Sequence, residues 1–204
     1  MSKTQIQKVK DDLNFVDDLF RKLIENLAGF EIASEAALPF GLKEHTRSVS
    51  WIAEQVVTQN LAKIKSELGL KKVEYHLKDT SLHDCEVRTA ANTFYINVKM
   101  HNMEGGDDRN DIAAAQKLLT AYKSKPAFNL IYCCVGIRFK GCKVSFDSSY
   151  MKVFSAQFLP SGIYINPANA KLQATYSHKS EIRSRKDFIK LLESKVAKLP
   201  KPKK

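Results

Sequence analysis

Long apolar runs are missing from this chain of 204 residues. Its longest ones, such as Leu130–Ile137, are far shorter than the roughly 20 residues that a membrane-spanning helix needs. The first residues, 1–4, lead into a charged amphipathic stretch where an export signal would have an apolar one. We therefore expect no membrane partner and a cytoplasmic protein.

Cysteine motifs that bind zinc are missing as well. The four cysteines form no Cys-x-x-Cys pair, and no histidine stands at zinc-finger spacing. Cys133 and Cys134 are adjacent in an apolar run, so in a strand they would point to opposite faces. We expect buried, reduced thiols. A glycine-rich phosphate loop and a nucleophile elbow are also absent, which argues against nucleotide-binding and serine-hydrolase chemistry.

Positive charge is what the chain has in excess. Lysine and arginine number 33 against 22 acidic residues, a net charge of +11. Each cation that neutralises a phosphate releases condensed counterions, so this balance suggests a polyanionic partner. Charge alone fits DNA, RNA or an acidic protein equally. The hydrophobic fraction of 44% is enough for a folded core and excludes disorder as the default.

The apolar pattern predicts one domain, residues 1–204, without internal repeats. Helical spacing runs from about 5 to 28 and from 48 to 68, and alternation then indicates strands. The apolar set expected for the second helix is Val49, Ile52, Val56, Ile64 and Leu68. The full set of expected elements is helices 5–28, 48–68, 112–123 and 185–196, strands 72–77, 84–89, 94–100, 128–139 and 142–146, a loop at 101–110 and an irregular segment at 147–180.

These elements divide the domain into four parts. Residues 1–45 would form an N-terminal helix and loop, a possible dimerisation element. Residues 46–138 would form the core, in the order helix, three strands, helix, strand. Residues 139–197 would add strands, a polar segment and a final helix, and residues 198–204 a basic tail.

Polar side chains on two of the predicted strands carry the chemistry. Successive side chains of a strand face opposite ways, so Asn97 and Lys99 share one face while the apolar residues between them share the other. Asp84 and Glu86 similarly share the polar side of the preceding strand. A turn at 91–93 would bring the two polar faces together, placing carboxylates, an amide oxygen and an ammonium around one point.

Such a grouping suits the hydrolysis of a phosphodiester. The reaction needs a hard cation, held by oxygen ligands, to neutralise charge and bind the attacking water. A nearby lysine can stabilise the negative charge that develops. We therefore expect Mg²⁺ as the cofactor.

The same residues resemble the restriction-endonuclease, or PD-(D/E)xK, superfamily, whose motif is Pro-Asp, a short spacer, then Asp or Glu, any residue, and Lys. Asp84 matches the first acid, Asn97 the second and Lys99 the lysine. The closest likeness is to type II restriction enzymes, many of which carry a strand like Phe94–Lys99. The resemblance covers residues 46–138 and implies an α/β fold with a mixed central sheet flanked by helices, in the order α-β-β-β-α-β.

The chain departs from that pattern at two positions. His83 replaces the usual proline, and Asn97 replaces the usual acid. An asparagine can coordinate a cation through its carbonyl oxygen but adds no negative charge. Metal affinity then rests more on Asp84, with help from Glu86 or a helix carboxylate, and the resemblance implies an activity weakened by Asn97.

The family often adds a catalytic glutamate from the helix before the first strand. Glu54 is the candidate, because it falls at the edge of the apolar stripe beside Leu61. An ordinary solvated glutamate would fit that position equally well. Glu35 and Glu44 are weaker options.

Residues around the second core helix could contact DNA. Asp111 or Asn110 can cap the predicted helix. Arg109 and Asn110 precede this helix, whose N-terminal amides favour a phosphate. Gln116 lies within it, and His101 and Asn102 follow the catalytic strand. Polar residues further along could contact the bases as a group: Lys152, Gln157, Asn166, Asn169, Gln173 and Lys179.

The leading hypothesis is thus a type II restriction endonuclease that cuts double-stranded DNA. Because the two strands are antiparallel, cutting both suggests a two-fold homodimer. One alternative is a repair or junction-resolving nuclease with the same core, which would choose its substrate by shape. The other is a basic nucleic-acid-binding protein without catalytic activity.

Overall fold

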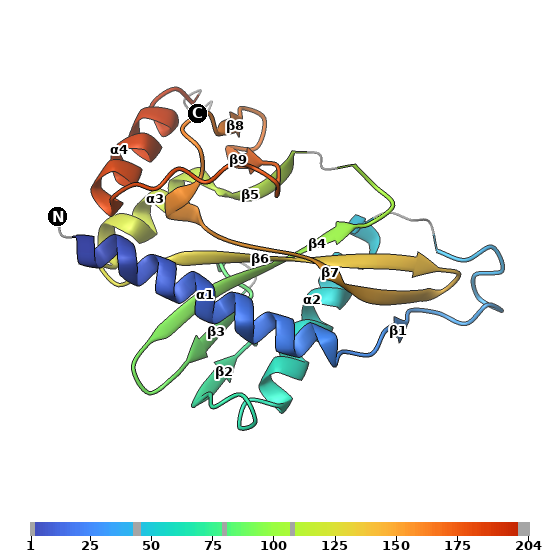
Figure 1. Ribbon diagram of the computed structural model, residues 1–204. Coiled ribbons are helices and arrows are strands. Elements are labelled where there is room, and N and C mark those ends of the chain that lie inside the picture. The colour runs from blue at the N-terminus through green and yellow to red at the C-terminus, as the bar shows by residue number, and fades with distance from the viewer. Residues whose placement is uncertain (1–2, 43–45, 79–80, 107–108, 200–204) are drawn as a thin grey trace.

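A six-stranded mixed sheet lies at the centre of the computed structural model, which describes residues 3–42, 46–78, 81–106 and 109–199 (Figure 1). Neighbouring strands pair antiparallel except β4 and β6, which run parallel. Across the sheet the order is β1 (Phe30–Glu31), β7 (Lys143–Ser155), β6 (Leu130–Lys140), β4 (Thr93–Asn102), β3 (Cys85–Arg88) and β2 (Lys72–Glu74).

Two helices cover one face of this sheet. In Figure 1, α1 (Lys3–Glu25) crosses β6 and β7, and α2 (Thr46–Lys63) packs against β4 and β2. Their buried residues form one hydrophobic core with apolar side chains of the sheet. The predicted apolar set of α2 was wrong at Ile52 and Val56, because Ala53 and Val57 are the buried residues there. The stripe consists of Val49, Ala53, Val57 and Leu61.

A second core lies on the opposite face. There α3 (Ala115–Ser124) and α4 (Arg185–Val196) pack with a three-stranded sheet of β5 (Asn110–Ala114), β9 (Lys171–Ala174) and β8 (Tyr164–Asn166), near a short 3₁₀ helix, η1 (Ala156–Phe158). Cys133 belongs to the first core and Cys134 to the second, and all four cysteines are buried and free, as expected. No helix of the described residues is both long enough and apolar enough to span a membrane.

The predicted order α-β-β-β-α-β is confirmed as α2-β2-β3-β4-α3-β6. One strand, β5, is inserted before α3, and this corrects the start of the predicted helix from 112 to Ala115. Asp111 does not cap a helix. Its carboxylate instead accepts a hydrogen bond of 2.8 Å from Gln173 Nε2 of β9, because strand pairing takes up this segment.

The segment 147–180 is more regular than its polar composition suggests. Strand β7 continues to Ser155, and β8 and β9 follow. The β6–β7 register shifts between Val135 and Gly136, so polar residues around 148 bulge outward before Met151 and Phe154 return to the core. Exposed serines at this bulge interrupt the alternation of apolar and polar residues, so the sequence pattern does not indicate a strand there.

Candidate active site

The β3–β4 hairpin sets the positions of the motif residues. Cys85 pairs with Ile96, and the backbone N–H of Asp84 donates to the Ile96 carbonyl at 2.8 Å, which extends the ladder by one residue. The backbone N–H of Val98 then donates to Asp84 Oδ2 at 2.7 Å. The aspartate is thus held against the strand that carries Asn97 and Lys99, as its polar alternation predicts.

Asn97 is buried, and only half of its amide is satisfied by the protein. Its Nδ2 donates to the Leu82 carbonyl at 3.0 Å, which ties the segment before Asp84 to β4. Its Oδ1 is buried without a hydrogen-bond partner among the described residues. An orphaned buried acceptor costs about 1–3 kcal/mol. This oxygen is therefore suited to a ligand that the protein does not itself provide.

Glu54 of α2, one position after buried Ala53, lines a cavity together with Asp84. Burial first, and then the negative charge of Asp84, raise the pKa of Glu54 to about 7, while Lys99 opposes the rise. Burial likewise raises the pKa of Asp84, again opposed by Lys99. Side chains of α2, of β4 and of the residue just before β3 thus act electrostatically on one another.

A cavity of about 550 Å³ opens beside these groups. Glu54, Asp84, Ser81 and His83 line it, together with Trp51. Trp51 is 71% exposed and lies one helical turn before Glu54. The sequence reading missed this residue, although its spacing of three from Glu54 on a helix was a usable signal.

The donor set suits a hard divalent cation. It consists of the carboxylates of Glu54 and Asp84 and the Oδ1 amide oxygen of Asn97, the ligand types that Mg²⁺ takes in proteins. Both carboxyl pKa values are raised by burial, so a positive charge between them would relieve an unfavourable arrangement. In the described ranges, no three His, Cys, Asp or Glu residues group as a metal site, because the third donor here is an amide.

Glu86, the alternative ligand, is engaged elsewhere. It lies opposite Tyr95, two residues along β3 from Asp84, and its Oε1 pairs with Arg88 Nη2 at 2.5 Å. Glu35 is exposed in a turn, and Glu44 lies outside the described residues. Of the glutamates considered, the structure places Glu54 with Asp84.

The proposed phosphate site before α3 needs correction. Asn110 begins β5 and pairs with Ala174, so neither it nor Arg109 stands at the N-terminus of a helix. The guanidinium of Arg109 lies 5.7 Å from the ring centroid of Tyr164. Arg109 is nevertheless exposed and available to a polyanion.

The remaining DNA-contact candidates are distributed along β4 and α3. The ring of His101 stacks on Tyr150 with centroids 4.2 Å apart. Asn102 Oδ1 accepts the backbone N–H of Glu104 at 3.1 Å, which stabilises the turn after β4. Gln116 is exposed on α3. Gln116 and the segment before Asp84 line a second cavity together.

The side-chain amides between residues 157 and 173, which were candidates for base contacts, form hydrogen bonds within the protein. Gln157 is 2% exposed and donates to the Arg183 carbonyl. Asn166 accepts from the backbone of Ala168, and Gln173 donates to the Asp111 carboxylate. Asn166 and Gln173 thus stabilise the three-stranded sheet and its turn, and Gln157 connects η1 to the segment before α4.

Residues 42–203 match the model of a protein family described as SwaI-like: SwaI restriction endonuclease. A search among curated proteins finds no match. The matched range contains Glu54, Asp84, Asn97 and Lys99.

Proposed function

Because this chain belongs to the SwaI-like family of restriction endonucleases, we propose that the pocket of Glu54, Asp84, Asn97 and Lys99 is the centre that cuts DNA, with Mg²⁺ as cofactor. The chain is a type II restriction endonuclease, and its partner is double-stranded DNA. The observation that carries the site proposal is the cavity that Glu54 and Asp84 line together, with Asp84 bonded to the strand that bears Lys99 and all three charges acting on one another.

Each residue of the pocket has a distinct task. Asp84 is held by the Val98 N–H, so that its other oxygen and the orphaned Asn97 Oδ1 present two oxygen ligands; Glu54 supplies the third. When bound there, Mg²⁺ supplies positive charge to the phosphate and lowers the pKa of a water. The ammonium group of Lys99 places a positive charge beside the cut phosphate, where negative charge develops during hydrolysis.

The assignment of Glu54 over Glu86 follows from charge. Glu86 already shares its charge with Arg88, whereas the carboxyl of Glu54 has its pKa raised to about 7 beside Asp84. A divalent cation gains more from two carboxylates in one partly buried pocket than from one that is already ion-paired at the surface.

Two finer points of the proposal concern assembly and location. Cutting both antiparallel strands of a duplex suits a two-fold homodimer with one centre for each strand. The N-terminal helix α1 is the proposed dimer element, and sedimentation in the presence of duplex DNA measures the stoichiometry. We place the enzyme in the cytoplasm, where it meets DNA.

Digestion of a defined plasmid tests the site. With Mg²⁺ the parent should give discrete fragments, and with a chelator none. Asp84→Asn, Lys99→Gln and Glu54→Gln should each cut at least about 100-fold more slowly while keeping the parent's circular dichroism spectrum. Glu86→Gln is the matched control and should stay within a few-fold of the parent. Normal cutting by Asp84→Asn would show that the centre lies elsewhere.

Metal binding can be measured apart from cleavage. Trp51 is the single tryptophan of the chain and lines the same cavity as Glu54 and Asp84. Titration with Mg²⁺ should change its fluorescence in the parent and in Lys99→Gln, but only at much higher concentration in Asp84→Asn. Equal titration curves for the parent and Asp84→Asn would contradict the ligand assignment.

A further inference from the structure

Trp51 is an exposed aromatic residue at the proposed active centre. It is the only tryptophan of the chain and is 71% exposed, although tryptophan is highly buried on average. Single apolar residues are ordinary on a protein surface. Trp51 differs from them by its position, because it lines the same cavity of about 550 Å³ as Glu54 and Asp84, the catalytic cavity of the proposed function.

Trp51 and Glu54 are neighbours on the surface of α2. Residues three apart on a helix lie on one face, with their Cβ atoms roughly 5–6 Å apart. The indole ring therefore begins about one helical turn from a carboxylate that we assign to Mg²⁺. A group bonded directly to the cut phosphate would lie within its reach.

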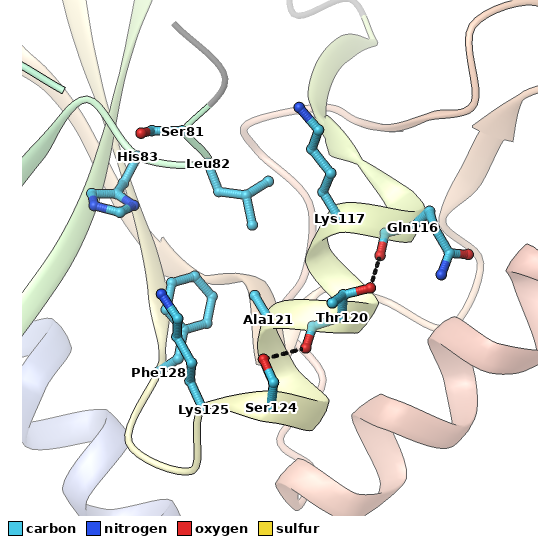
Figure 2. A pocket seen from close by; sticks show the side chains of 10 residues that line it. All are labelled: Ser81, Leu82, His83, Gln116, Lys117, Thr120, Ala121, Ser124, Lys125 and Phe128. Carbon is cyan, nitrogen blue, oxygen red and sulfur yellow. Dashed lines mark hydrogen bonds between the residues drawn. The ribbon is translucent and has the colours of Figure 1, made fainter. Parts of the chain in front are cut away.

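The segment before β3 forms another wall of the catalytic cavity. Ser81 and His83 line both this cavity and the second one, of about 400 Å³, whereas Leu82 lines only the second of the two. Figure 2 shows that Leu82 extends toward α3 and that His83 extends to the other side of the segment. A DNA strand bound in the catalytic cavity therefore lies between this segment and α2, where Trp51 is exposed.

The lining of the catalytic cavity offers apolar surface as well as charge. Three of its residues carry a large apolar side chain, Trp51, Tyr75 and Leu77, and of these three only Trp51 is exposed. The lining also has polar side chains besides the two carboxylates, those of Gln55, Lys78, Ser81 and His83. A ligand that suits this lining has an anionic group for the metal side and an apolar group beside it. A nucleotide of DNA has both, a phosphate and the deoxyribose bonded to it.

We propose that the indole ring of Trp51 packs against the deoxyribose bonded to the phosphate that is cut and holds that nucleotide in place. This inference rests on the proposed function, because it takes the pocket at Asp84 as the place of the cut phosphate. The sugar is the part of the nucleotide next to the phosphate, whereas the base lies beyond the sugar. Full burial of a tryptophan covers roughly 150–250 Å². At the usual stabilisation per area of apolar surface, covering half of the open part of Trp51 changes the affinity for DNA about 10–40-fold.

The accessibility of the single tryptophan tests this contact directly. A labelled duplex that contains the site mapped by plasmid digestion is bound in a chelator, so that it stays intact, and the anisotropy of the label measures binding. Acrylamide should quench the fluorescence of the bound parent about half as strongly as that of the free parent, because half of the open ring is covered. A Trp51 ring that acrylamide reaches equally in the bound and the free parent would overturn the proposal.

Moving the tryptophan provides the control. Phe40 is 99% exposed in the loop after β1, where the Leu42 N–H donates to the Gly141 carbonyl at the β6–β7 turn. In the double variant Trp51→Phe/Phe40→Trp, acrylamide should quench the fluorescence equally with and without the duplex. Equal protection of the tryptophan at both positions would show that the duplex shields the protein surface in general, and the proposal would fail.

Duplex binding by single variants separates apolar contact from charge. Trp51→Ala should bind about 10–40-fold more weakly at every salt concentration but keep the parent's slope of log K against log salt, because no phosphate contact is lost. Trp51→Phe should stay within about three-fold of the parent, since a smaller ring still covers the sugar. Phe40→Ala should bind as the parent does. Parent-like binding by Trp51→Ala, a shallower slope, or an equal loss in Trp51→Phe would each contradict the sugar contact.

The same measurements separate this inference from the proposed function. If the parent binds and cuts the duplex while Trp51 stays open to acrylamide, the sugar contact alone fails. If the parent neither binds nor cuts duplex DNA, the proposed function itself fails.

Discussion

Replacing Glu54 by glutamine should stabilise the metal-free protein while abolishing its activity. Burial and the charge of Asp84 raise the pKa of this carboxyl from its ordinary 4.5 to about 7, so its ionised form is unfavourable in the folded state. The difference corresponds to about 3 kcal/mol. Glu54 is only half-buried, and screening by solvent reduces the effect. We therefore expect Glu54→Gln to raise the free energy of unfolding by about 1–2 kcal/mol.

The gain should depend on pH in a defined direction. An acid with a raised folded pKa binds more protons in the folded than in the unfolded state between pH 4.5 and 7. Its penalty is therefore absent below about pH 4.5, grows as pH rises, and is complete above about pH 7. Glu54→Gln should match the parent at pH 4.5 and exceed it at pH 8.

Urea unfolding in a chelator at the two pH values measures this difference, with Glu86→Gln as a control that should show no gain. Adding Mg²⁺ at pH 8 should then stabilise the parent more than Glu54→Gln, because a ligand that binds the folded state adds stability in proportion to its affinity. A Glu54→Gln protein no more stable than the parent at pH 8 would refute the reasoning from buried charge.

Three further substitutions test other parts of the structure. Asn97→Asp replaces the amide that donates to the Leu82 carbonyl by a third carboxylate, so in a chelator it should lower the free energy of unfolding by about 1–3 kcal/mol, while fluorescence titration shows tighter Mg²⁺ binding. Unchanged affinity for Mg²⁺ would remove Asn97 from the ligand set. Gly136→Ala would put a Cβ 2.9 Å from Met103 Sδ at the bulge and should cost about 1–3 kcal/mol in urea unfolding, where a neutral result would mean that the bulge can adjust. Arg185→Met removes hydrogen bonds to three backbone carbonyls beside α3 and should lower the free energy of unfolding by about 2 kcal/mol or more; a loss under 0.5 kcal/mol would indicate that water replaces them.

The polar face of the catalytic strand could be predicted from the sequence because strand geometry alone decides which side chains share a face. A period of two places Asn97 and Lys99 on one face whatever the rest of the chain does. The turn near residue 92 then fixes which residue of β3 stands opposite. Asp84 is placed by pairing with the immediate neighbour in sequence, which is the kind of contact that local patterns describe best.

Features that depend on distant segments could not be read in this way. Strand β5 exists because it pairs with β9, some 60 residues later, and the local pattern around Asp111 also suits a helix cap. The face of α2 is set by packing against the sheet, so Val57 is buried where the pattern favoured Val56. The spacing of Trp51 and Glu54 on α2 is a local signal, but the cavity that both line also needs the segment before β3.

Parallel pairing of β4 with β6 has a consequence for the order in which the enzyme matures. A ribosome makes the motif strand well before Leu130, where its second neighbour in the sheet begins, and the opposite core still awaits Phe188 and Leu192. Parallel strands depend on such long-range closure before they gain stability. We therefore expect nascent chains to be inert toward DNA until the ribosome has made the residues of α4, long after the motif strand itself.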